Sequence, residues 1–456
     1  MQDTDKLSRE ELLEINRQLQ RQNERLQAEV ERLKKKLSAA PFAKGTRKKN
    51  PQRPGRKPGQ GRFARRPAPS PAASTASTRV PVEESCCPFC GGAWGPPEEE
   101  VVSNSDLPGQ PPSEVQVFVV EKKCCQNCGK TVRGRHPAVA ADQYGATAHR
   151  VGARAKAVMH TLHYGLGVPQ RKVPQIMKEL SGLEITQGAL SQDAQKQTAG
   201  AVGAAYRQLR AEIPQSPVVH TDDTGWRVGG DAAQLMVFTT PQITVYQVRP
   251  RHRNEEVREV IGDDFQGVLE CDRGKNYEAE ELNGVKQQKC LSHLIRNTKE
   301  VEPRQCGSAR QFPRQLRELL QHGLRLARRR PQLEEASFQQ QVAALDQALD
   351  DLLLDRTLRN RDNQRLLDGI GAEQDRNNLL RFLRDPQVEP TNNRAERALR
   401  PAVIRRKVSH CSKTEPGARA FEAFLSVIQT YKQQSPASVS QQLFNLFSSS
   451  GPAPPS

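Results

Sequence analysis

Three segments of the sequence place carboxylates where a divalent cation could bind. Asp222 and Asp223 follow a short β-type run at 217–219, Asp272 ends a second β-type run, and Glu396 lies in a block rich in asparagine and arginine. We expect the first run to end before a glycine-containing turn that presents the two aspartates. Converging carboxylates repel by roughly 4 kcal/mol per pair at 4 Å, and a hard cation such as Mg²⁺ removes this cost. The alternative is an acid-rich turn without a ligand.

These acids belong to motifs that occur in a fixed order along the chain. The motifs are Asp222-Asp-Thr-Gly-Trp226, Leu269-Glu-Cys-Asp-Arg-Gly-Lys-Asn-Tyr277, Cys290-Leu-Ser-His293 and Asn392-Asn-Arg-Ala-Glu-Arg-Ala-Leu-Arg-Pro401. Together they resemble the insertion-sequence-66 family of transposases, over about residues 85–440. The block that contains Glu396 is the most specific part of the likeness.

The resemblance implies an Asp-Asp-Glu DNA transposase that cleaves and joins the ends of an insertion sequence. Its catalytic triad would be Asp222, Asp272 and Glu396, which would hold two Mg²⁺ ions. The family commonly reads Asp-Glu-Thr where this chain has Asp-Asp-Thr, so Asp222 is matched to the first acid and Asp223 is kept as an alternate. Two alternatives stay open: a zinc-containing DNA-binding regulator without catalysis, and a ribonuclease-H-like nuclease that does not join DNA.

The elements that must position the acids read as a mixed sheet with flanking helices. Three closely spaced β-type runs predict a meander, and a helix then leads to the strand that ends at Asp272. These segments are 217–221, 234–239, 243–248 and the helix 253–261. They suit a ribonuclease-H-like core, which is the fold that the resemblance implies, and we assign that core to residues 214–300 and 386–432.

An insertion explains the uneven spacing of the acids. Asp222 and Asp272 are 50 positions apart, whereas Asp272 and Glu396 are 124 apart. The leucine-rich, charged pattern between them is helical, so we predict an α-helical insertion at 301–385. Asn392 or Asn393 is expected to cap the helix that presents Glu396.

Two Cys-x-x-Cys pairs, each followed by glycine, have the spacing of a four-thiolate zinc site. The expected ligands of one structural Zn²⁺ are Cys87, Cys90, Cys125 and Cys128. Cys86 and Cys124 each precede a pair, which leaves a shift of one residue open. We assign a zinc ribbon to 81–137, with a strand at 115–120 between the two pairs.

Two further motifs are less specific. Cys290 and His293 at the start of a helix are interpreted as packing or positioning residues, because two ligands do not close a zinc site. Within a helical region at 138–213, a helix, a turn at Gly182 and a second helix opened by Thr186 give a helix-turn-helix outline for recognising the element's ends.

Charge points to DNA as the partner. The formal net charge of +17 favours a polyanion, and the basic segment 41–80 is expected to be a disordered linker that tracks phosphates. Phosphate-positioning cations are expected around Glu396. They are Arg397, Arg400, Arg405, Arg406 and Lys407.

The two ends complete a multidomain chain of α+β and α/β parts. Leucines at every seventh position within residues 1–40, with asparagines at two of the a positions, predict a parallel coiled coil and hence a homodimer. Residues 433–456 are expected to be a disordered tail. The sequence has no long apolar run, and we expect a cytoplasmic, nucleoid-associated bacterial protein without membrane contact. Proteins encoded by the same element are expected as accessory partners.

Overall fold

The computed structural model describes most of the chain beyond residue 150. The described residues are 9–38, 90, 92–93, 115–126, 128, 130–136, 139, 143, 150–354 and 356–449. The chain divides into two units, Met1–Asp106 and Leu107–Ser456, which are described separately. The predicted linker at 41–80 and Cys87 lie outside the described residues. Among the described helices, none is both long and apolar enough to cross a bilayer.

In the first unit, the predicted N-terminal helix is present. It is α1 (Arg9–Ser38), and it ends where the sequence predicted. Leu19, Leu26 and Val30 of its apolar stripe are exposed, at 56%, 58% and 48%. The stripe is therefore available to another helix, while the predicted pairing stays a prediction.

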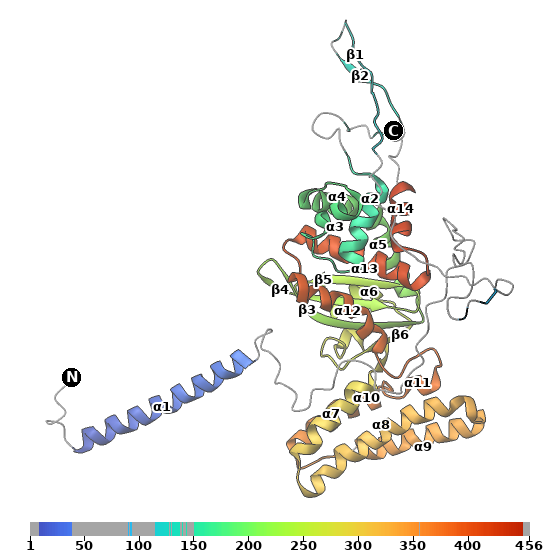
Figure 1. Ribbon diagram of the computed structural model, residues 1–456. Helices are drawn as coiled ribbons and strands as arrows, with labels where there is room; N and C mark the ends of the chain where they lie inside the picture. The colour runs from blue at the N-terminus through green and yellow to red at the C-terminus, as the bar shows by residue number, and fades with distance from the viewer. Residues whose placement is uncertain are drawn as a thin grey trace. The chain divides into compact units, whose positions relative to one another are not determined.

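The second unit contains a five-stranded mixed sheet in the order β5-β4-β3-β6-β7 (Figure 1). Its strands are β3 (Val218–Val228), β4 (Asp231–Thr239), β5 (Thr244–Arg249), β6 (Val268–Cys271) and β7 (Lys286–Lys289). The first three form the predicted antiparallel meander. β6 runs parallel to β3, and β7 runs parallel to β6. A sheet of this kind is compatible with the nuclease-like core expected from the sequence.

β3 is longer than predicted. The expected end of the strand near Asp222 is wrong, because β3 continues through Gly225 and Trp226 and turns at Gly229. Gly229 has a φ of 62°, as a two-residue hairpin turn requires. The full ladder with β4 explains the extension, since Asp222 and Asp223 pair with Val237 and Met236. Both aspartates therefore lie on a rigid strand and not in a turn.

Helices cover both faces of the sheet. One face packs Met236 and Phe238 of β4 against α6 (Asn254–Ile261) and α5 (Ala201–Glu212). The other packs Val237 against α12 (Asn393–Ser409) and α13 (Glu415–Gln434), drawn in orange and red in Figure 1. The alternation along β4 thus gives the sheet two distinct apolar layers.

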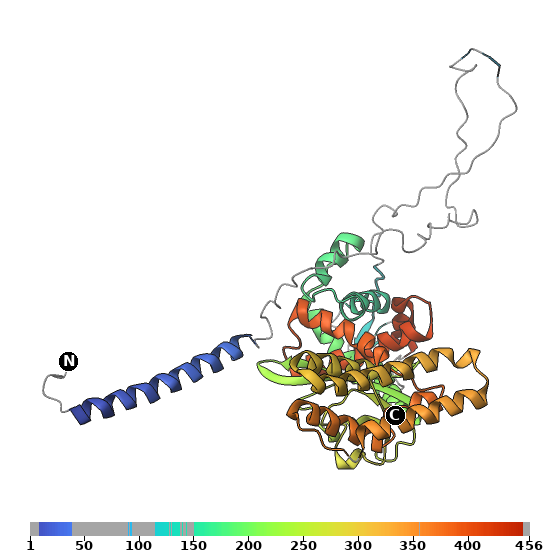
Figure 2. The same ribbon diagram turned by 90° about the horizontal axis from the view of Figure 1, so that it is seen from below.

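The insertion is helical, as predicted. Its core is continuous with one end of the sheet through Val218 and Val268. The helices within the predicted range are α8 (Gln311–Arg329), α9 (Glu335–Leu353), α10 (Arg361–Asp375) and α11 (Arg381–Arg384). α7 (Leu291–Val301), which the sequence analysis assigned to the core, precedes them and packs against α8. The two long helices α8 and α9 lie side by side in both views (Figure 2).

The predicted order of a helix, a glycine turn and a second helix is present before the sheet, while its role in DNA recognition stays a prediction. α3 (Val173–Ser181) ends at Gly182, whose φ of 66° is the left-handed conformation of a helix C-cap. α4 (Gln187–Ala199) begins at Thr186, whose hydroxyl accepts from the backbone N–H of Ala189 at 3.1 Å. A short helix α2 (Ala153–His160), followed by a π-helical turn at Thr161–Gly165, completes this region with α5.

Two predictions about the ends of the second unit are wrong. The expected strand at 115–120 is irregular, with Val119 97% exposed and so without an apolar surface to pack on. A hairpin of β1 (Lys122–Cys124) and β2 (Thr131–Arg133) follows this segment in the sequence. The supposedly disordered tail contains α14 (Val439–Ser449), because Leu443 is fully buried in a cluster with α2 and α13. Residues 450–456 lie outside the described part.

Candidate active site

Asp222 and Asp272 occupy matching positions along the neighbouring parallel strands β3 and β6. The β3–β6 register pairs His220 with Glu270. Asp222 lies two residues beyond the first and Asp272 two residues beyond the second, directly after the end of β6. Since side chains two positions apart share a face, and adjacent strands are about 4.8 Å apart, the register predicts that Asp222 and Asp272 are neighbours on one face.

Glu396 reaches this face from the first turn of α12. Three contacts hold the helix along β3. The Asn392 Nδ2 donates to the carbonyl oxygen of Thr221 at 2.7 Å, and Arg406 donates from one guanidinium nitrogen to the Thr224 hydroxyl at 2.7 Å and to the Gly225 carbonyl at 2.6 Å. The predicted side-chain cap is wrong: Asn392 occupies the N-cap position, but its side chain makes no capping bond because it is turned toward β3.

The pKa of Asp222 reflects its burial and the charges of other acids near it. Burial raises the pKa of Asp222 to about 7, and Asp272, Asp223 and Glu396 add repulsion. The backbone N–H of Asp223, which donates to Asp222 Oδ1 at 2.9 Å, opposes the rise. Burial also raises the pKa of Asp272. His293, Lys289 and His252 oppose the rise at Asp272. The donors are hard carboxylate oxygens that repel one another, so they fit a divalent cation such as Mg²⁺.

Asp223 lies on the opposite face of β3 from Asp222, although its charge still repels both Asp222 and Asp272. It pairs with Met236, whose side chain belongs to the opposite apolar layer, whereas Asp222 pairs with Val237 on the α12 side. Asp223 Oδ1 lies 3.2 Å from His252 Nδ1. It therefore has a partner of its own that the sequence did not suggest.

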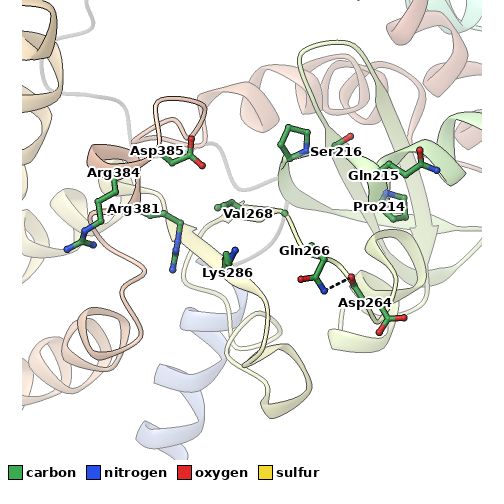
Figure 3. Close-up of a pocket in the computed structure, with 12 residues that line it drawn as sticks. Pro214, Gln215, Ser216, Asp264, Gln266, Val268, Lys286, Arg381, Arg384 and Asp385 are labelled. Carbon is green, nitrogen blue, oxygen red and sulfur yellow. Dashed lines mark hydrogen bonds between the residues drawn. The ribbon is translucent and has the colours of Figure 1, made fainter. Parts of the chain in front are cut away.

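A separate pocket lies at the other end of the same strands (Figure 3). It has a volume of about 600 Å³ and includes Lys286, Arg381 and Arg384 but none of the three acids. Arg384 forms an ion pair with Asp346, and Arg381 donates to the backbone carbonyl of Gln287 at 3.1 Å. Because two of its cations are engaged in this way, we assign the chemistry to the acid cluster.

A family model described as "Transposase IS66 family" matches residues 149–420, which is more than half of the chain. The chain belongs to the IS66 transposase family. Membership gives it a role in DNA transposition and hence in DNA binding. The matched range of this IS66-family chain contains Asp222, Asp272 and Glu396. A comparison with curated protein sequences finds no match.

The cations of α12 in this IS66-family chain differ in availability. Arg397, Arg400 and Lys407 are exposed. Arg406 is engaged with β3, and Arg405 is half-buried, with one guanidinium nitrogen 2.9 Å from the Nε2 of His163 in the π-helical turn. Burial lowers the Arg405 pKa. Arg405 and Arg406 thus tie α12 to its neighbours, which leaves the exposed three as the better candidates for phosphate contact.

Cys290 and His293 lie beside Glu396, which spacing alone did not reveal. Cys290 is the N-cap residue of α7, and its sulfur accepts from the backbone N–H of Asn392 at 3.2 Å. His293 Nε2 lies 3.9 Å from Glu396 Oε1. A hydrogen bond with Cys290 raises the pKa of His293, and the charge of Glu396 adds to the rise although burial opposes it. These contacts are compatible with the predicted packing or positioning role, which stays a prediction.

The predicted zinc ligands are described in part. Cys90, Cys125 and Cys128 are exposed, and Cys125 follows β1 directly, so the second pair lies in the turn of the short hairpin. Cys90 belongs to the first unit and the second pair to the other. Cys87 lies outside the described residues, and the four-thiolate site stays a prediction.

Proposed function

We propose that the chain cleaves the ends of its insertion sequence and joins them to target DNA, with Asp222, Asp272 and Glu396 holding two Mg²⁺ ions. The proposal is supported by the register that brings Asp222 and Asp272 next to each other and by the repulsion that Asp272, Asp223 and Glu396 add to the burial of Asp222, whose pKa rises to about 7. When bound, the ions would supply an activated oxygen nucleophile and stabilise the leaving 3′ oxygen of DNA.

The chain's own residues would organise this chemistry. Asp222 would lose its proton as the cation binds, because a protonated carboxyl is a poor ligand. Asn392 orients Glu396 through its bond to β3. The exposed cations Arg397 and Arg400 would bind DNA phosphates and fix the backbone in line with the acids. Asp223, held by His252, would take no part as a ligand.

Recognition and pairing of DNA ends would come from the other parts of the chain. The order of α3, the turn at Gly182 and α4 matches the outline of a helix-turn-helix, and α4 would then read the major groove. The predicted zinc ribbon and the basic segment at 41–80 would add phosphate contacts. Pairing of α1 between two protomers would bring two ends together, since its apolar stripe is exposed.

A cleavage-and-joining assay with the parent element's ends tests the proposal. Asp222→Asn, Asp272→Asn and Glu396→Gln each remove one charge with little change of shape. Each should abolish both steps while binding to the ends persists, because a repulsive charge near phosphate is lost. Asp264→Asn is the matched control, since Asp264 is exposed and lies before β6, whereas Asp272 lies after it.

Asp223→Asn separates the two neighbouring aspartates. It should retain activity, because Asp223 lies on the other face of the sheet. Joining at the wild-type rate by all three triad variants would contradict the metal-ion mechanism. Cleavage by the wild-type protein without joining would identify a nuclease, and binding without cleavage a regulator.

A further inference from the structure

Cys290, His293 and Glu396 bring three different kinds of metal ligand together. One ligand atom from each lies within 4.8 Å of the other two. The sulfur comes from the residue before α7, the imidazole from the first turn of that helix, and the carboxylate from the first turn of α12. Two hydrogen bonds donated by backbone N–H groups join these helix starts. Asn392 N–H donates to the Cys290 side-chain sulfur at 3.2 Å, and Leu291 N–H donates to the backbone carbonyl of Pro390 at 3.0 Å.

We propose that these three residues form a second cation site that takes Zn²⁺, and that its occupancy withdraws Glu396 from the acid triad and inhibits the enzyme. The inhibitory part rests on the proposed function, because it assumes that Glu396 is needed for the reaction. The binding part stands on the three ligands alone.

The chemistry of the ligands separates this site from the acid cluster. Thiolate and imidazole select zinc and similar ions, whereas Mg²⁺ prefers oxygen ligands alone. Three protein ligands leave a fourth position open, as in zinc sites that bind water or an external ligand. His293 and Glu396 are partly exposed, at 30% and 38% of the side chain, so an ion can enter from solvent.

The geometry needs a small adjustment. A tetrahedral zinc ion with bonds of about 2.0–2.3 Å separates its ligand atoms by about 3.3–3.7 Å, and His293 Nε2 and Glu396 Oε1 are 3.9 Å apart. Cys290 is buried and held by Asn392, so the partly exposed His293 and Glu396 side chains are the ones that can adjust. A Glu396 carboxylate bound to this ion would no longer be available to the acid triad. The His293 imidazole lowers the pKa of nearby Asp272, and nearby Arg296 lowers the pKa of His293.

Cobalt binding tests the site without relying on activity. Full-length protein that already holds its tightly bound zinc is titrated with Co²⁺ in a phosphine reductant, and the thiolate-to-cobalt charge-transfer band is recorded. The wild-type protein should show the band with about one added equivalent. Cys290→Ser should lose it, while Cys306→Ser, which alters an exposed cysteine elsewhere, should keep it. An equal band in the Cys290→Ser protein would overturn the proposal.

Zinc inhibition tests the consequence. Mg²⁺-dependent cleavage is measured with and without added Zn²⁺ at the concentration that displaces cobalt, and each protein is compared with itself. Wild-type activity should fall at least about tenfold, because a triad ligand is taken. The loss in Cys290→Ser should be less than about twofold, since two ligands hold zinc weakly. Equal inhibition of both proteins would contradict the inhibitory role. A wild-type protein inactive with Mg²⁺ would contradict the proposed function instead, and cobalt binding would still decide the site.

Discussion

Asn392 connects the two parts of the chain that carry Asp222 and Glu396, because its Nδ2 donates a 2.7 Å hydrogen bond to the carbonyl oxygen of Thr221. Thr221 directly precedes Asp222 on β3, and Asn392 directly precedes the helix that presents Glu396. Asn392 is 1% exposed. A buried side chain therefore links the segment that carries Asp222 to the start of the helix that carries Glu396.

Asn392→Ala should lower activity and stability together. It leaves the buried Thr221 carbonyl without its hydrogen bond, which costs about 1–3 kcal/mol of unfolding free energy. It also frees the start of α12, and a displacement of about 1 Å at a reacting site can reduce the rate about 100-fold. Cleavage rate and thermal midpoint are the measurements. Asn393→Ala is the matched control, since Asn393 is exposed and adjacent; equal rates for both variants would contradict the positioning role.

The Asp222 pKa predicts how stability depends on pH in magnesium-free protein. The folded value of about 7 lies above the ordinary 3.8 of the unfolded chain. This protonation therefore stabilises the fold fully below about pH 4, and the contribution is lost as the pH rises through 7. At pH 8, Asp222→Asn should be more stable than the wild type by about 1–3 kcal/mol, and near pH 4 the two should agree.

Thermal midpoints at pH 4 and pH 8 measure this difference, with Asp264→Asn as the control. Adding Mg²⁺ at pH 8 should stabilise the wild-type protein more than Asp222→Asn, because the ion binds the ionised carboxylates of the folded state. If the difference in thermal midpoint between the wild-type protein and Asp222→Asn is the same at both pH values, Asp222 is not protonated in the metal-free site.

The structural zinc is predicted to depend on the cysteines of the two Cys-x-x-Cys pairs and not on the cysteine that precedes each pair. After dialysis, the protein should hold one Zn²⁺ per chain, and Cys90→Ala or Cys125→Ala should lose it. Cys124→Ala should keep it, since Cys124 lies in β1 one residue before the pair. Elemental analysis decides the matter. Zinc lost from Cys124→Ala and kept by Cys125→Ala would move the ligand register by one residue.

The sequence could predict the elements that carry the acids because their signals are local. The predicted strand at 217–221 is the first part of β3, although the strand continues to Val228 and so carries both aspartates. The end of β6 before Asp272 and the helix start near Glu396 follow from equally short patterns. Each of these requires no knowledge of distant partners.

The contacts between those elements could not be predicted, since they depend on long-range packing. The Asn392 side chain was expected to cap its helix and instead bonds β3. Cys290 and His293 form a group of possible metal ligands only together with Glu396, which lies about a hundred positions further along the chain. The C-terminal segment looked polar, yet Leu443 finds a buried site against α2 and α13. In each case the partner is supplied by the tertiary fold.

The exposed stripe of α1 predicts that two copies of the chain pair through this helix. Leu19 and Leu26 occupy equivalent heptad positions and are more than half exposed, so pairing would bury them. Replacing both with glutamate should abolish the dimer, because charges would enter the apolar seam. The control replaces Arg21 and Ala28 with glutamate. Both residues are exposed and occupy the f position of the heptad, away from the seam. Sedimentation should give a monomer for the first variant and a dimer for the control. An unchanged mass in both would place dimerisation in another part of the chain.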